Sequence, residues 1–276
     1  MCFVAIVAMA QNKAEIMVSY NYVFPNKNGK NQTEQMTLMA SSLEAKYFSE
    51  LSQWVDSMKS TIEGKAQYMD ILKKACMTVD ADGSIAIDLT KGPVKKTYTY
   101  VSNNPSEESL TYYDKFGDGL GCYSEPLSEI KWTIVEDSMA TVIGYECIMA
   151  VSDYHGRHWK AWFAPEIPLS YGPWKLRGLP GLILRAEANG GFSFTATGLE
   201  RTERPILPVY RQQEYVKVDR KKALESAEYF LNNRESIIKA QERNVEFYSV
   251  DDNGNKVETP KYDGLKHSLE PDYKMK

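Results

Sequence analysis

Apolar and polar residues alternate along most of the chain, which predicts a mainly β protein. Residues 15–24 (EIMVSYNYVF) alternate and are rich in aromatic side chains, so they predict a strand that ends at Pro25. Residues 35–40 and 45–48 predict two further strands, although 42–60 as a whole also fits a helix, and both interpretations stay open. The period of two then returns in a series of short segments, at 96–101, 109–114, 130–135, 143–149, 157–163, 182–188 and 192–197.

Two segments have the apolar spacing of a helix instead. Residues 62–77 place Tyr68, Ile71, Leu72 and Ala75 on one face, and residues 219–243 carry an apolar stripe behind Asp219 as N-cap. Since no helix separates most of the strands, short connections predict an antiparallel meander. We therefore expect an α+β, mainly β fold: a curved antiparallel sheet, partly closed and barrel-like, with one or two packed helices. One domain is predicted over 11–245, followed by a polar, flexible tail over 246–276.

The first ten residues, MCFVAIVAMA, are typical of a signal peptide. The run from Cys2 to Ala10 is apolar and ends in a small-x-small cleavage pattern, but it lacks a charged start, so the segment is truncated or forms a first apolar strand. No other run approaches the ~20 apolar residues of a membrane span. We expect an exported protein, periplasmic or associated with the outer envelope, that does not span a membrane.

The net charge bears on which partners the protein can bind, and the cysteine content bears on whether it forms a disulfide. With 33 Lys and Arg against 37 Asp and Glu the net charge is −4, which offers no footprint for nucleic acid. Export permits a disulfide, and Cys122 and Cys147 are the favoured pair because both flank one predicted strand region. Unpaired buried cysteines remain the alternative.

The sequence lacks the local motifs of the common enzyme classes. It has three histidines, and His155 and His158 face opposite sides of a strand unless a turn intervenes, so no metal site is predicted. No catalytic residue and no cofactor are predicted. The alternative is a hydrolase of the envelope whose site would combine Arg157, His158, Glu166 and Glu187.

Glycine and proline residues are concentrated in residues 172–184, GPWKLRGLPGLIL, which lead into a predicted apolar strand. Prolines cannot donate in a central ladder, and glycines allow positive φ and close approach of the backbone. The segment is therefore predicted to be a connection with a fixed path, in which Gly178, Gly181, Leu182 and Ile183 are structural. It serves either as a rigid crossover or as the lip of a pocket or partner surface.

The hexapeptide from Gly178 to Ile183 spells GLPGLI, and the chain resembles the GLPGLI family of exported proteins from Bacteroidetes. The resemblance covers residues 132–188 and includes Gly144-Tyr145-Glu146-Cys147, Gly156-Arg157 and Gly172-Pro173-Trp174-Lys175. It implies export and a role in the cell envelope. The family has no settled activity, so the resemblance assigns no catalytic residue.

Aromatic side chains are concentrated in this same block. On a curved sheet they can line an apolar cavity or fill an ordinary core, and the predicted plan loosely resembles periplasmic lipoprotein carriers. We expect a non-enzymatic envelope protein that binds a lipid or other apolar ligand, or an envelope protein partner. The candidate binding residues are Arg157, Trp159, Trp162, Phe163, Tyr171, Trp174, Leu179 and Pro180.

Overall fold

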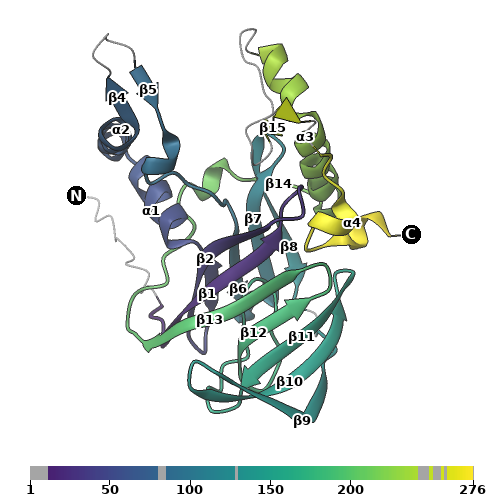
Figure 1. Cartoon of the computed structure of the whole chain (residues 1–276). Coiled ribbons are helices and arrows are strands. Elements are labelled where there is room, and N and C mark those ends of the chain that lie inside the picture. The colour runs from purple at the N-terminus through teal and green to yellow at the C-terminus, as the bar shows by residue number, and fades with distance from the viewer. Residues whose placement is uncertain are drawn as a thin grey trace, which may run out of the picture.

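The computed structural model describes residues 12–79, 85–127, 130–241, 249–250, 256–257 and 260–275 (Figure 1). The predicted signal peptide, residues 1–10, lies outside the described residues. Among the described residues, no helix combines the length and apolarity needed to cross a membrane.

One large sheet dominates the described part of the chain and confirms the predicted mainly β fold. Its twelve strands are, in spatial order, β14 (Val216–Lys217), β8 (Gly119–Pro126), β7 (Ser109–Phe116), β6 (Tyr100–Asn104), β3 (Ala45–Phe48), β2 (Asn31–Ala40), β1 (Ile16–Pro25), β13 (Phe192–Arg201), β12 (Leu182–Ala188), β11 (Arg157–Ala164), β10 (Tyr145–Tyr154) and β9 (Thr133–Val142). Neighbours are antiparallel, except that β14 runs parallel to β8. The sheet is strongly curved but open, with β14 and β9 at its two edges (Figure 1).

Helices and two small hairpins complete the fold. The helices are α1 (Glu50–Lys59), α2 (Ile62–Cys76), α3 (Arg220–Gln241) and α4 (Gly264–His267), with 3-10 turns η1 (Leu89–Lys91), η2 (Pro105–Glu107), η3 (Gln212–Glu214) and η4 (Pro271–Lys274). The hairpins pair β4 (Met77–Val79) with β5 (Ile85–Ile87) and β15 (Ser249–Val250) with β16 (Lys256–Val257). Both interpretations of 42–60 hold in part, because β3 ends at Phe48 and Ser49 then caps α1 by accepting from the Ser52 N–H.

Local sequence chemistry explains the short hairpins β9–β10, β10–β11 and β12–β13. His155 and Gly156, with φ of 51° and 78°, form the two-residue loop between β10 and β11, and positive φ at both positions matches the twist of the flanking strands. In β13 the side chains of Phe192, Phe194 and Ala196 are buried, whereas Ser193 and Thr195 are partly exposed. That alternation confirms the predicted apolar face.

The connection from β11 to β12 follows a fixed path across the sheet. Its backbone folds back on β12, since the Ile183 N–H donates to the Tyr171 carbonyl at 2.9 Å. Gly181 packs against β11 so closely that an added Cβ would lie 2.3 Å from the Ala164 oxygen, and Gly178 has a φ of +88°. Both glycines are therefore required by the backbone path.

Two sequence predictions are corrected. Cys122 and Cys147 are both free and buried; they lie on β8 and β10, near opposite edges of the sheet, and so cannot bridge. In the predicted polar tail 246–276, the described residues 260–275 form α4 and η4 and pack beside α3 (Figure 1). Glu270 is 3% exposed and Tyr273 6%, because their polar atoms find partners inside the fold.

Candidate functional site

A cavity of about 290 Å³ lies between one face of the sheet and the layer formed by α3 and the C-terminal segment. Its apolar wall comes from Tyr22, Phe24, Met36, Tyr47, Phe116, Trp174, Phe194, Leu224, Ala227 and Leu269. Its polar lining comes from Glu34, Lys96, Thr97, Thr99, Tyr112, Asp114, Lys115, Tyr262, His267, Ser268 and Glu270. We refer to it below as the ring-lined cavity.

Pairing of β1 with β13 builds the aromatic part of the wall. Tyr22 lies opposite Phe194 in the ladder, and their rings stack with centroids 4.6 Å apart and planes 13° apart. Phe24 stacks on the other side of Tyr22 at 4.9 Å, while Phe194 continues to Trp159 at 6.1 Å. These nearly parallel rings form one continuous aromatic stack, of which Tyr22, Phe24 and Phe194 line the cavity.

Two residues that line the cavity each carry a buried polar atom with no hydrogen-bond partner among the described residues. These atoms are the Tyr47 hydroxyl and the Trp174 indole Nε1, in side chains that belong to residues only 1% and 2% exposed. Buried tyrosine and tryptophan side chains usually satisfy these groups. Their lack of a partner is therefore unusual for buried groups of this kind.

Trp174 reaches the cavity from a strained backbone. Its φ is +56°, a conformation that costs a bulky residue on the order of 1–3 kcal/mol. The indole is held by stacking on Trp159 at 5.7 Å and by edge contacts with Tyr154 and His155. The surrounding fold thus fixes the side chain that lines the cavity.

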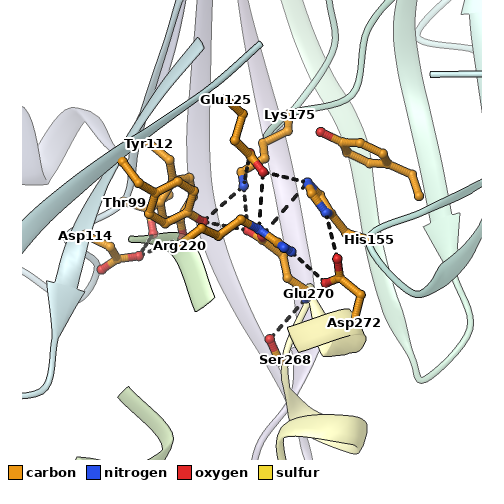
Figure 2. Close-up of polar contacts among 12 residues, drawn as sticks. Thr99, Tyr112, Asp114, Glu125, His155, Lys175, Arg220, Ser268, Glu270 and Asp272 are labelled. Carbon is orange, nitrogen blue, oxygen red and sulfur yellow. Dashed lines mark hydrogen bonds and ion pairs between the residues drawn. The ribbon is translucent and has the colours of Figure 1, made fainter. Parts of the chain in front are cut away.

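Asp114 of β7 contributes a carboxylate that lines the cavity. It accepts from the Thr99 hydroxyl at 2.6 Å, from the Tyr112 hydroxyl at 2.9 Å and from the Lys115 backbone N–H at 2.6 Å (Figure 2). Burial raises the pKa of Asp114 above its ordinary value, although these donors oppose that shift. All three donors come from the protein, so Asp114 is already well satisfied.

Beside the cavity lies a buried group of charges, which we call the ionic cluster (Figure 2). Lys175, from the loop after β11, contacts Glu125 of β8 at 2.6 Å and Glu270 at 2.7 Å. Arg220, at the start of α3, contacts Glu270 at 2.5 Å and Glu125 at 3.2 Å. The members of the ionic cluster are Glu125, His155, Lys175, Arg220, Glu270 and Asp272.

His155 joins the ionic cluster from the β10–β11 turn. Its Nε2 lies 3.3 Å from a Glu125 oxygen and 3.9 Å from a Glu270 oxygen, while its Nδ1 lies 3.3 Å from Asp272. Asp272 also contacts Arg220 at 2.6 Å. With His155 protonated, three cations face three carboxylates.

The pKa values of His155 and of the three carboxylates in the ionic cluster move toward the charged form. Burial by itself would lower the pKa of His155, but Asp272, Glu125 and Glu270 raise it above 6.5. Burial would raise the pKa of Glu125, yet His155 and Lys175 lower it to about 2. The same balance holds the pKa values of Glu270 and Asp272 below their ordinary range.

Glu125, His155 and Glu270 could also offer one ligand atom each to a metal ion, because these atoms lie within 4.8 Å of one another. Lys175 and Arg220, however, already contact both carboxylates. A cation would have to displace an ammonium and a guanidinium from their ion pairs. The arrangement therefore favours an electrostatic clamp that ties the C-terminal segment to the sheet and to α3.

The predicted binding residues lie in several different environments. Trp174 lines the cavity. Trp159, Phe163, Tyr171 and Leu179 are buried in the main core, and Trp162 is partly buried under the Arg185 guanidinium at 4.6 Å. Pro180 is exposed and is not part of the cavity wall.

Arg157 has a positioning role that sequence reasoning did not assign. The guanidinium stacks over Phe192 at 4.8 Å and donates to the backbone carbonyls of Leu265, Lys266 and Ser268. Arg157 thus holds the segment that contributes the outer wall of the cavity.

The four residues of the hydrolase alternative do not form a common site. His158 contacts Asp153 at 2.9 Å and is exposed, and Glu187 is paired with Arg185. Glu166 is exposed in the turn after β11. Within the described residues, no hydrogen bond or ion pair joins any two of the four side chains, Arg157, His158, Glu166 and Glu187, so the geometry gives this alternative no support.

A second cavity, of about 630 Å³, lies on the opposite face of β7, where Thr111 and Tyr113 point away from the ring-lined cavity. Some of its hydroxyls already have partners: Thr111 pairs with Ser124 at 3.0 Å, and Tyr113 with Gln212 at 2.9 Å. The ring-lined cavity has more aromatic side chains in its wall and is therefore the better candidate site for an apolar ligand.

Comparison with known proteins adds a partial family match. The model of a family described as "Protein of unknown function (Porph_ging)" matches residues 146–185, which run from β10 to β12. No curated protein sequence matches the chain.

Among solved structures, the chain is similar to PNGF-II in its C2 and P21 crystal forms. The sequence identity is 13% in both, with TM-scores of 0.49 and 0.48. The match covers 77% and 78% of this chain but only 32% and 33% of those chains, so this chain spans about a third of their length. A likeness this distant says nothing about activity.

Proposed function

We propose that the protein binds a small, mainly apolar ligand in the ring-lined cavity and acts as a binding protein rather than an enzyme. The observation that carries the proposal is the cavity itself, whose wall is rich in aromatic side chains, among them Tyr22, Trp174 and Phe194, and which also has polar lining residues. Ligand sites are typically concave and apolar with a few placed polar groups that fix orientation. The candidate binding residues are therefore Tyr22, Tyr47, Trp174, Phe194 and Ala227.

Export to the cell envelope is part of the same proposal. The apolar run from Cys2 to Ala10 supports it, and so does the GLPGLI resemblance over 132–188. The family model that matches residues 146–185 overlaps this block. Trp174, which belongs to the motif-rich loop, connects the block to the cavity.

A variant whose side chain fills the cavity tests the binding proposal. Ala227 of α3 lines the cavity, so the Ala227→Phe variant places a ring in it. Ala240 is exposed near the end of the same helix and does not line the cavity, so Ala240→Phe is the matched control. The probe is prodan, a polarity-sensitive dye with two fused aromatic rings.

We expect prodan fluorescence to shift to the blue and to saturate with wild type and with Ala240→Phe, and the saturable signal to disappear with Ala227→Phe. Equal binding by both variants would place the dye elsewhere and contradict the proposal. Native mass spectrometry of protein purified without detergent complements the assay. An added mass present in wild type and lost in Ala227→Phe would identify the natural ligand.

A further inference from the structure

The C-terminal segment, residues 260–275, forms one wall of the ring-lined cavity without belonging to the sheet. It folds into α4 and η4, and these described residues contribute no strand to the large sheet (Figure 1). Five of its residues line the cavity: Tyr262, His267, Ser268, Leu269 and Glu270. The segment is therefore a separate element that lies against the cavity, and its attachments decide how firmly that wall is held.

Helix α3 provides one attachment through the carboxylate of Glu228. This carboxylate accepts from the Tyr273 hydroxyl at 2.8 Å and from the Lys274 ammonium at 2.6 Å. It also accepts from the Gly264 backbone N–H at 3.2 Å. Glu228 does not line the cavity, so these hydrogen bonds hold the segment without forming part of the cavity wall.

The turn between β10 and β11 provides a second attachment. His155 pairs with Asp272 at 3.3 Å, and the Arg157 guanidinium donates to backbone carbonyls of the segment. Gly156 approaches the segment so closely that an added Cβ would lie 2.9 Å from the Asp272 backbone nitrogen. The docked position of the segment therefore depends on a glycine in this turn.

The segment itself buries few large apolar side chains. Leu265 and Met275 are 47% and 53% exposed, and Leu269 is only partly buried. Tyr273 is buried, but its hydroxyl belongs to the contact with Glu228. Segments with few buried apolar contacts open at a lower free energy than the strands of a core, so this wall can move while the sheet stays folded.

We propose that the C-terminal segment is a movable wall of the ring-lined cavity, and that its displacement sets the rate at which bound ligand leaves. The inference rests on the proposed function and adds the regulation of that site. Glu228 and Gly156 position the wall although neither lines the cavity. Weakening either attachment therefore shortens the time that a ligand stays bound and leaves the aromatic side of the cavity unchanged.

Release of prodan, followed by stopped-flow fluorescence after dilution, tests the attachment on α3. Glu228→Ala removes the hydrogen bonds to the segment, and Glu225→Ala is the matched control, an exposed glutamate of the same helix that does not line the cavity. We expect the dissociation rate to rise at least about tenfold in Glu228→Ala, since one hydrogen bond to a charged group contributes about that factor. Glu225→Ala should release prodan as wild type does, and the association rate should fall in neither variant.

A pair of glycine variants tests the attachment at the β10–β11 turn. Gly156 and Gly144 both have positive φ, +78° and +88°, but around the Cβ position of Gly144 no described atom lies within 4 Å. Gly156→Ala and Gly144→Ala therefore introduce similar backbone strain, and only Gly156→Ala pushes on the C-terminal segment. We expect Gly156→Ala to release prodan severalfold faster than Gly144→Ala.

Hydrogen exchange of wild type observes the wall without any substitution. Saturating prodan should slow amide exchange severalfold in peptides from residues 260–275 and leave exchange in β9, at the far edge of the sheet, unchanged. Unchanged exchange in 260–275 on prodan binding would mean that the wall does not move, and would overturn the inference even if a variant failed to fold.

The outcomes separate this inference from the proposed function. If prodan does not bind wild type, the proposed function fails. If prodan binds, but Glu228→Ala and Gly156→Ala release it no faster than their controls, the wall is fixed and the inference is overturned while the proposed function stands. Complete loss of prodan binding in both folded variants also overturns it, because the segment would then be a rigid part of the site.

Discussion

Glu270→Gln tests whether the ionic cluster ties the C-terminal segment to the fold. The Glu270 side chain is 4% exposed and contacts Lys175 at 2.7 Å and Arg220 at 2.5 Å. It also accepts from the Tyr123 hydroxyl at 3.0 Å. The substitution keeps the shape of the side chain but removes its charge, which leaves the fully buried Lys175 with Glu125 as its one remaining carboxylate contact among the described residues.

Removing one partner of a buried charge pair costs about 3–5 kcal/mol of unfolding free energy. For a chain of this size each kcal/mol lowers the melting temperature by about 2–4 °C, so the expected loss is about 6–20 °C by calorimetry. Glu203→Gln is the matched control: the same chemical change in a surface pair with Lys13, whose side chains are 83% and 65% exposed. It should leave the melting temperature unchanged, because exposed pairs contribute little.

A double variant sharpens the test. If Lys175 and Glu270 stabilise each other, Lys175→Met combined with Glu270→Gln should lose less stability than the two single changes added together. Strict additivity, or a Glu270→Gln melting temperature equal to that of Glu203→Gln, would refute the clamp. Either result would mean that the C-terminal segment is held by its apolar contacts and backbone hydrogen bonds alone.

Three further predictions follow from the same structure. The fold raises the pKa of His155 above 6.5, so the stability that its protonated form contributes is complete below about 6.5 and is lost as the pH rises through the folded pKa. The difference in melting temperature between wild type and His155→Gln should therefore shrink as the pH rises. A difference that stays constant with pH would contradict this. Gly181→Ala should lower the melting temperature far more than Gly178→Ala, because only at Gly181 would the new Cβ collide with backbone; equal losses would mean that φ strain alone matters. Cys122 and Cys147 should alkylate in denaturant without reductant and resist alkylation in the native state; mass spectrometry that finds them linked would restore the disulfide.

Much of the sheet is predictable because its hairpins are local. The alternation in 192–197 and the turn at His155-Gly156 each depend on neighbouring residues, so sequence patterns reveal them. The pairing of Tyr22 with Phe194 joins positions far apart in the chain, and no local pattern encodes it. The cavity wall depends on that pairing, which is why sequence reasoning placed the aromatic site around Trp159 and Phe163 instead.

The ionic cluster escaped prediction for a different reason. Glu270 and Asp272 lie in a polar stretch, and polar stretches usually face solvent. Their burial depends on Glu125, Lys175 and Arg220, which come from three other parts of the chain. A charged residue is buried only where its partners assemble, and those partners cannot be recognised until the sheet has brought them together.

The cavity and the ionic cluster share residues and adjoin each other. Glu270 belongs to both, since it lines the cavity and contacts Lys175 and Arg220, and Trp174 precedes Lys175 in the same strained loop. Ser268 and Leu269, which precede Glu270 in the chain, line the same cavity. If a bound ligand stabilises the ion pairs of Glu270, then by linkage those ion pairs strengthen ligand binding by the same factor.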